Sequence, residues 1–172
     1  MSSRNAPNPN SPRPDSPDHS RSEHDQDHAP QGDAHAAPGH ATSIAPHRGS
    51  VATTRGICIT CAPRYEREMS DPAKPQHVFT YSIRIENTSR ETVQLRTRHW
   101  VIVDAHGKRE EVHGEGVVGT TPTLEPGRHF QYESWCPLAS RWGTMEGHYG
   151  FVTSEGDPFD AEIARFYLVA ED

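Results

Sequence analysis

The feature that most limits the fold of this chain is a strict alternation of apolar and polar side chains along its second part. The clearest run contains the apolar residues Phe79, Tyr81, Ile83 and Ile85, each followed by a polar residue. Successive side chains of a β-strand point to opposite faces of a sheet, so this period of two predicts a strand buried on one face. No stretch shows a convincing helical period, which favours an all-β fold.

Turn signals separate about seven runs of this kind. The predicted strands cover residues 56–61, 79–86, 93–103, 108–113, 130–133, 149–153 and 159–168. The polar run at 108–113 suits an edge strand, and a change of phase near Ala164–Arg165 predicts a β-bulge. About seven short antiparallel strands predict a β-sandwich of the immunoglobulin or fibronectin type III kind.

Composition divides the chain into two parts near residues 51–55. Residues 1–50 contain eight of the 15 prolines and six of the 12 histidines, and they lack aromatic residues. A segment of this composition buries too little apolar surface to offset the entropy of ordering its backbone. We therefore expect a disordered extension rich in histidine, proline and serine at residues 1–53, and a folded domain at residues 54–172.

Charge and hydropathy argue against several classes of protein. The formal net charge is −7 and no basic stripe is present, so we expect no nucleic-acid binding. No run of 18 apolar residues occurs and the sequence opens without an apolar leader, so we expect no membrane span, no signal peptide and a cytoplasmic location. The common sequence motifs of hydrolases, metalloproteases and P-loop enzymes are absent, so we expect no catalytic residues and no enzyme activity.

The segment Gly114-Glu-Gly-Val-Val-Gly119 has the spacing G-x-G-x-x-G, which cradles a pyrophosphate in dinucleotide-binding proteins. That use requires a helix directly after the glycines. Pro122 and Pro126-Gly127 follow instead, and they do not permit such a helix. The motif is therefore interpreted as a connection between two strands whose backbone needs glycine. An anion nest formed by the N–H groups around Gly114, Gly116 and Gly119 stays open as an alternative.

Four short motifs stand out in the folded part. They are Arg98-His99-Trp100, Gly114-Glu-Gly-Val-Val-Gly119, Pro126-Gly127 and Gly143-x-Met145-x-Gly147-x-Tyr149. Together they resemble the ApaG family, and the resemblance extends from about Arg55 to Val169. It implies a fibronectin type III-like sandwich, no dinucleotide site, and an indirect link to cobalt resistance and magnesium efflux. Related domains in eukaryotic F-box proteins and in a polymerase-interacting protein imply a protein-binding module.

Two residues near the glycine motif are candidates for anion binding. Arg98 and His99 could bracket a phosphate beside the loop, although strand alternation sends their side chains to opposite faces. The simpler interpretation is structural, with Trp100 in the core and His99 satisfying a local hydrogen bond.

Candidate metal ligands fall into two groups. In the extension, His24-Asp-Gln-Asp-His28 suits weak binding of cobalt or nickel, although a solvated linker is the simpler interpretation. In the domain, His113 and His148 are the candidates. The further donors there are His129, Glu110, Glu111 and Glu115. No H-x-H, H-x-x-x-H or H-E-x-x-H spacing occurs in this domain, so any site must be assembled across strands.

The cysteines carry little functional signal. Cys58-Ile-Thr-Cys61 has the spacing C-x-x-C, but it lies on a predicted strand, where residues three apart point to opposite faces. We therefore expect two reduced thiols rather than a metal site or a disulfide.

Aromatic and arginine residues late in the chain predict a partner surface. The candidates are Trp135, Arg141, Trp142 and Tyr149. These residue types dominate interface energetics, and two tryptophans in one loop region are costly to expose. We therefore predict a non-catalytic module without a cofactor, monomeric or homodimeric, that binds an unidentified protein. The alternative is a sensor that binds a divalent cation or a phosphate-type or pyrophosphate-type ligand at the glycine-rich loop.

Overall fold

The computed structural model describes residues 48–71 and 73–171. Strands make up most of this part, and it contains one short 3-10 helix, η1. The elements are β1 (Ser50–Thr54), β2 (Ile57–Tyr65), η1 (Arg67–Met69), β3 (His77–Asn87), β4 (Val93–Asp104), β5 (Arg109–Glu115), β6 (Thr123–Leu124), β7 (His129–Leu138), β8 (Trp142–Thr153) and β9 (Pro158–Val169). Within the described ranges, no helix is long and apolar enough to cross a membrane.

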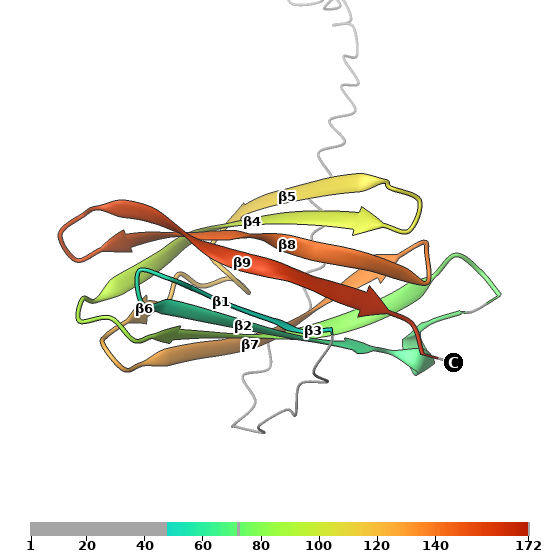
Figure 1. The fold of residues 1–172 in the computed structure, drawn as a ribbon, viewed down its shortest axis with the longest axis horizontal. Coiled ribbons are helices and arrows are strands. Elements are labelled where there is room, and N and C mark those ends of the chain that lie inside the picture. The colour runs from blue at the N-terminus through green and yellow to red at the C-terminus, as the bar shows by residue number, and fades with distance from the viewer. Residues whose placement is uncertain (1–47, 72, 172) are drawn as a thin grey trace, which may run out of the picture.

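The strands form two antiparallel sheets that face each other (Figure 1). One sheet has the order β1-β2-β3-β7. The other has the order β5-β4-β8-β9, with β6 paired to β4. This arrangement confirms the predicted all-β sandwich of the immunoglobulin and fibronectin type III kind. β1 and β7 are the outer strands of the first sheet, and β5 and β9 are those of the second.

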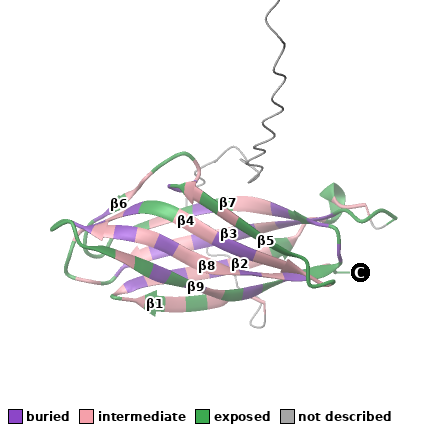
Figure 2. Ribbon diagram, turned by 90° about the horizontal axis from the view of Figure 1, so that it is seen from above, coloured by how far each residue is buried: buried purple, intermediate pink, exposed green. Residues whose placement is uncertain are grey.

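The core forms where the apolar sides of the alternating strands meet. Every second residue of β3 from Phe79 to Ile85 is buried, as the alternation predicts. Figure 2 shows buried bands crossing both sheets between exposed and half-buried ones. Trp100 of β4 packs edge-on against Tyr81, Tyr149 and Phe166, at 5.7, 5.9 and 6.1 Å between ring centroids. These aromatic contacts join the two sheets across the core.

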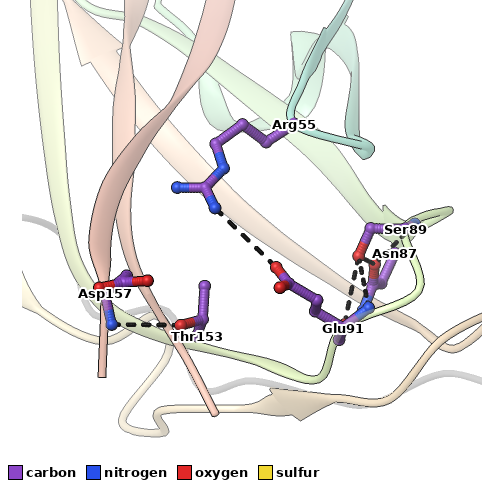
Figure 3. A network of polar contacts seen from close by, with 6 residues as sticks. All are labelled: Arg55, Asn87, Ser89, Glu91, Thr153 and Asp157. Atoms are coloured by element: carbon purple, nitrogen blue, oxygen red, sulfur yellow. Dashed lines mark hydrogen bonds and ion pairs between the residues drawn. The ribbon is translucent and has the colours of Figure 1, made fainter. Parts of the chain in front are cut away.

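A buried side chain also organises one end of the sandwich. Asn87, at the end of β3, is fully buried, and its amide donates to the carbonyl oxygens of Glu91 and Leu124 at 2.8 and 2.9 Å. Its own side-chain oxygen accepts two hydrogen bonds from Ser89, from the backbone N–H and the hydroxyl. The cluster, which includes the Arg55–Glu91 ion pair, is drawn in Figure 3. The turn that connects β3 to β4 is therefore fixed by the asparagine itself.

The structure differs from the sequence prediction in the number of strands and in where the first strand begins. Nine strands are present in the described part rather than about seven, because β1 and β6 escaped prediction. β1 begins at Ser50, so the predicted boundary between residues 53 and 54 lies too late in the chain. β1 pairs with β2 over its whole length, and the Ser50 hydroxyl donates to the carbonyl oxygen of Ala164 at 2.6 Å. The prediction for residues 1–47 lies outside the described residues.

Two β-bulges shape the second sheet. The register between β8 and β9 shifts between Met145 and Gly147, where Ala164 and Arg165 together oppose one residue, which confirms the predicted bulge. A second shift, between Leu95 and Thr97 of β4, was not predicted. Because of this second shift, Arg98 and Trp100 share the inner face with Leu95, and His99 points outward.

Candidate functional site

Three histidines lie in one row on the outer face of the second sheet. Antiparallel pairing places His99 of β4 directly opposite His113 of β5 on one side and His148 of β8 on the other. The His99 and His113 rings are stacked, with centroids 4.0 Å apart and planes inclined by 11°. The His148 ring meets the His99 ring edge-on, at 4.9 Å between centroids. The sheet thus brings histidines from three strands together. A metal site in this domain would have to be assembled across strands in this way, because the sequence contains no short histidine motif there.

Glu111 completes a compact group with two of these histidines. It lies two residues before His113 on β5 and on the same face, and its Oε2 is 2.9 Å from His99 Nε2 and 3.6 Å from His113 Nε2. Its other oxygen, Oε1, forms an ion pair with Arg109 at 2.7 Å. The hydrogen bond from His99 is the main cause that lowers the pKa of Glu111, so the carboxylate is charged at neutral pH.

A close approach between strands sets the position of His99. A side chain at Gly147 of β8 would place a Cβ atom 1.9 Å from the carbonyl oxygen of His99, so only glycine fits there. The backbone of β8 can therefore pass directly beside His99, and the next residue of β8, His148, comes into ring contact with it. His148 also lies 3.8 Å from Asp160 of β9, measured from Nε2 to Oδ2.

The predicted anion site is not brought together. Arg98 lies on the opposite face from His99, as the alternation indicated, so the two cannot bracket one phosphate. Its guanidinium occupies the space that a side chain at Gly114 would fill. From there Nη1 donates to the carbonyl oxygens of Glu115 and Gly116, at 2.8 and 3.1 Å. Arg98 therefore supports the glycine loop from inside.

The glycine motif itself forms a tight turn. The Gly116 N–H donates to the carbonyl of Arg96, and Val117 and Thr120 exchange backbone hydrogen bonds at 2.8 and 2.9 Å. Gly116 has a φ of +60°, and a Cβ atom there would lie 2.2 Å from the carbonyl oxygen of Thr120. Gly119 also has a positive φ, of +76°. The glycines are thus needed by the turn, and three of its N–H groups are already engaged.

The four predicted partner-binding residues do not share one surface. Tyr149 is fully buried, so its assignment to a partner surface is wrong. Its hydroxyl forms a hydrogen bond with that of Tyr132 on the facing sheet, and burial raises the pKa of both phenols well above the usual value. Trp135 lies in β7 of the first sheet and is half-buried, whereas Trp142 opens β8 of the second. Their outward sides face away from each other.

Trp142 has an exposed aromatic neighbour that the sequence did not single out. Trp142 is opposite Val169, and Tyr167 is the next residue of β9 on the same outward side. The two rings are 50% and 44% exposed. Arg141 is also exposed, and its carbonyl oxygen accepts a hydrogen bond from the Ala170 N–H at 2.8 Å.

The remaining candidates are dispersed. Cys58 and Cys61 point to opposite sides of β2, as predicted, and all three cysteines are free thiols. Burial raises the pKa of both Cys61 and Cys136 to about 12. His24 and His28 lie outside the described residues.

The fold and these sites define a class: a β-sandwich with a short glycine turn at one edge and a polar, histidine-bearing outer sheet. Comparison with known proteins identifies the family. A family model of the ApaG domain matches residues 67–153. The protein ApaG of Xanthobacter autotrophicus is 48% identical over 121 residues, which cover 70% of this chain and 93% of that protein. The protein ApaG of Methylobacterium sp. (strain 4-46) is 49% identical over 117 residues, covering 68% and 90%.

A solved structure agrees with these sequence comparisons. The crystal structure of an ApaA protein from Bordetella pertussis is similar, with a TM-score of 0.65 and 40% identity, covering 74% of this chain and 98% of that one. This chain belongs to the ApaG family.

Proposed function

We propose that this chain is a non-catalytic binding module, and that it takes a protein partner on the outer face of the β5-β4-β8-β9 sheet. The observation that supports this most is the pair formed by Trp142 and Tyr167. They are two of the four large apolar side chains exposed in the described part of the chain, and they are diagonal neighbours on adjacent strands of one face. Tryptophan and tyrosine are the residue types most enriched at the energetic centre of interfaces.

The surroundings of this pair have the character of an interface rim. Glu146 of β8 and Arg165 of β9 lie next along the same face and form a two-pronged ion pair at 2.7 and 3.0 Å. An aromatic centre bordered by such polar groups is the usual composition of a protein interface. The link to cobalt resistance and magnesium efflux that the family resemblance implies would then act through the partner.

The test uses the full chain as bait on beads, incubated with a lysate of cells that express it. Three forms are compared by mass spectrometry: the wild type, the double variant Trp142→Ala/Tyr167→Ala, and Val51→Ala. Val51 is a matched control because it is an exposed apolar residue on a strand of the other sheet. The proposal expects a protein that the wild type and Val51→Ala retain and the double variant loses.

A quantitative step follows with that protein purified. The double variant should bind that protein with a dissociation constant at least about 30-fold higher than the wild type does, which is the effect of losing one interface hot spot. Circular dichroism checks that the variants remain folded. Retention of the same proteins by all three forms would rule out this surface.

A phosphate sensor at the glycine loop is the second candidate, and the geometry favours it less. The turn uses its N–H groups at Gly116, Val117 and Thr120 internally, and Arg98 donates to loop carbonyls. Titration of the full chain with pyrophosphate, beside Gly116→Ala, tests it: saturable binding that the variant loses would revive this candidate.

A further inference from the structure

We infer that the outer face of β4 and β5 holds one divalent transition cation of the zinc, cobalt or nickel class, with His99, Glu111 and His113 as its protein ligands. The donor atoms of these three side chains all lie within 4.8 Å of one another. They come from two adjacent strands whose pairing fixes their relative positions. This site is separate from the aromatic pair proposed to bind a protein, because His99 lies opposite His148, which is six positions along β8 from Trp142, about 20 Å of strand.

The spacing of the donors suits coordination. Two donors bound at about 2.0–2.1 Å to a tetrahedral ion lie roughly 3.3 Å apart. The distances from Glu111 Oε2 to Nε2 of His99 and of His113 are 2.9 and 3.6 Å, which lie on either side of that value. Small side-chain movements therefore bring the three donors onto one ion.

His99 and Glu111 form the prearranged half of the site. The carboxylate only accepts hydrogen bonds when charged, so His99 Nε2 donates the proton in the 2.9 Å contact between them. A cation takes the place of that proton on Nε2: a neutral ring then carries its single proton on Nδ1, and a charged ring keeps the Nδ1 proton and releases the Nε2 proton to water. Arg109 holds Oε1 of the same carboxylate at 2.7 Å, which directs Oε2 toward the histidines.

His113 is the adjustable ligand. Its ring is stacked almost parallel to that of His99, with an angle of 11° between the planes, so the two lone pairs do not yet converge on one point. The His113 side chain is 68% exposed, whereas that of His99 is 18% exposed. His113 is therefore free to turn toward the ion while His99 keeps its place.

The donor set selects the class of ion. Two imidazoles and one carboxylate suit zinc, cobalt and nickel, whereas magnesium and calcium prefer oxygen ligands alone. Three protein ligands leave a fourth position of a tetrahedral ion for water or another small ligand. His148, which contacts His99 and lies near Asp160, stands beside the group rather than within it.

The experiment titrates the full chain with zinc chloride and, separately, with cobalt chloride. Calorimetry counts the bound equivalents, and cobalt absorbance reports the coordination. The site variants are His99→Asn, Glu111→Gln and His113→Asn. His129→Asn is the matched control, because it removes an exposed histidine from β7 of the other sheet. The variant His24→Asn/His28→Asn separates any binding by those two histidines, which lie outside the described residues.

The expected result is one saturable equivalent that each site variant weakens at least about tenfold and that both other variants keep. Nitrogen correlation spectra of the imidazoles should show the Nε2 signals of His99 and His113 moving on addition of zinc. Far-ultraviolet circular dichroism confirms that the variants are folded. The inference is overturned if the site variants bind as the wild type does, or if His24→Asn/His28→Asn abolishes binding while the site variants keep it.

Discussion

The buried tyrosine pair provides a prediction that separates a core role from a surface role. Tyr149 and Tyr132 join the two sheets through their hydroxyl groups, and both side chains lie in the core. Tyr149→Phe leaves the Tyr132 hydroxyl buried without this partner, and Tyr132→Phe does the same to Tyr149. An unsatisfied buried hydroxyl costs about 1–3 kcal/mol, so each single substitution should lower the free energy of unfolding by that amount.

The double substitution should cost much less than the sum of the two. Removing both hydroxyls loses one net hydrogen bond, worth about 0.5–1.5 kcal/mol, and leaves neither group stranded. For central values the singles sum to about 4 kcal/mol and the double costs about 1 kcal/mol, which gives a coupling of about 3 kcal/mol.

Urea unfolding measures all four proteins of this cycle. Trp100 lies 5.9 Å from the Tyr149 ring, so tryptophan fluorescence is a suitable signal. The slope of the unfolding free energy with urea concentration should be the same for all four proteins. The midpoints of unfolding then report differences in stability alone. Additive losses, within about 0.5 kcal/mol, would refute the reasoning. Partner capture by the folded Tyr149→Phe variant should equal that of the wild type.

Three further predictions concern other parts of the fold. Gly116→Ala should lower the free energy of unfolding by about 1–3 kcal/mol, because the alanine must hold a φ of +60° and its Cβ meets the carbonyl oxygen of Thr120 at 2.2 Å. Gly119→Ala has open space around its Cβ and should lower the free energy of unfolding by less in the same urea assay. Cys58 should react with a thiol reagent at pH 8 well before the two buried cysteines, whose pKa burial raises to about 12, and peptide mapping checks the order; equal labelling would contradict it. The hydrogen bond from Arg165 of β9 lowers the pKa of Glu146, so the stability that this pair adds is present above the unfolded pKa of about 4.3 and disappears as the pH falls through the lower folded value. Glu146→Gln should therefore lower the free energy of unfolding by under about 1 kcal/mol at pH 6 and leave it unchanged near pH 2. An equal loss of stability at both pH values would be inconsistent with this assignment.

The fold could be predicted from sequence because the apolar residues alternate along β3 and over long stretches of the other long strands. The same signal located the bulge at Ala164–Arg165, where the phase changes. It missed β1, because this strand is short, half-exposed and made mostly of small polar residues. β1 is held in place by pairing with β2 and by its contacts with β9, and these long-range interactions leave no local pattern.

The candidate site could be predicted only in part. The predicted strands 93–103 and 108–113 leave only a short turn at residues 104–107 between them, and this turn fixes the register of the hairpin, so that His99 faces His113. Pairing the residues of the two strands outward from that turn would have placed His99 opposite His113, with Glu111 on the same face of the sheet. The burial of Tyr149 also follows from its alternation with Phe151, but the partner of its hydroxyl comes from the other sheet. Such pairing between sheets cannot be read from one segment.

The outer strands β5 and β7 have a consequence for how the molecule behaves at high concentration. An unpaired strand edge is a template on which another chain can add, and aggregation often begins there. Here β5 carries charged residues at most of its positions, among them Arg109, Glu110 and Glu111, and Pro137 deprives β7 of one backbone donor. A second copy that approaches either of these two edges meets repulsion or a missing hydrogen bond, so the sandwich is protected there against growing into a continuous ribbon.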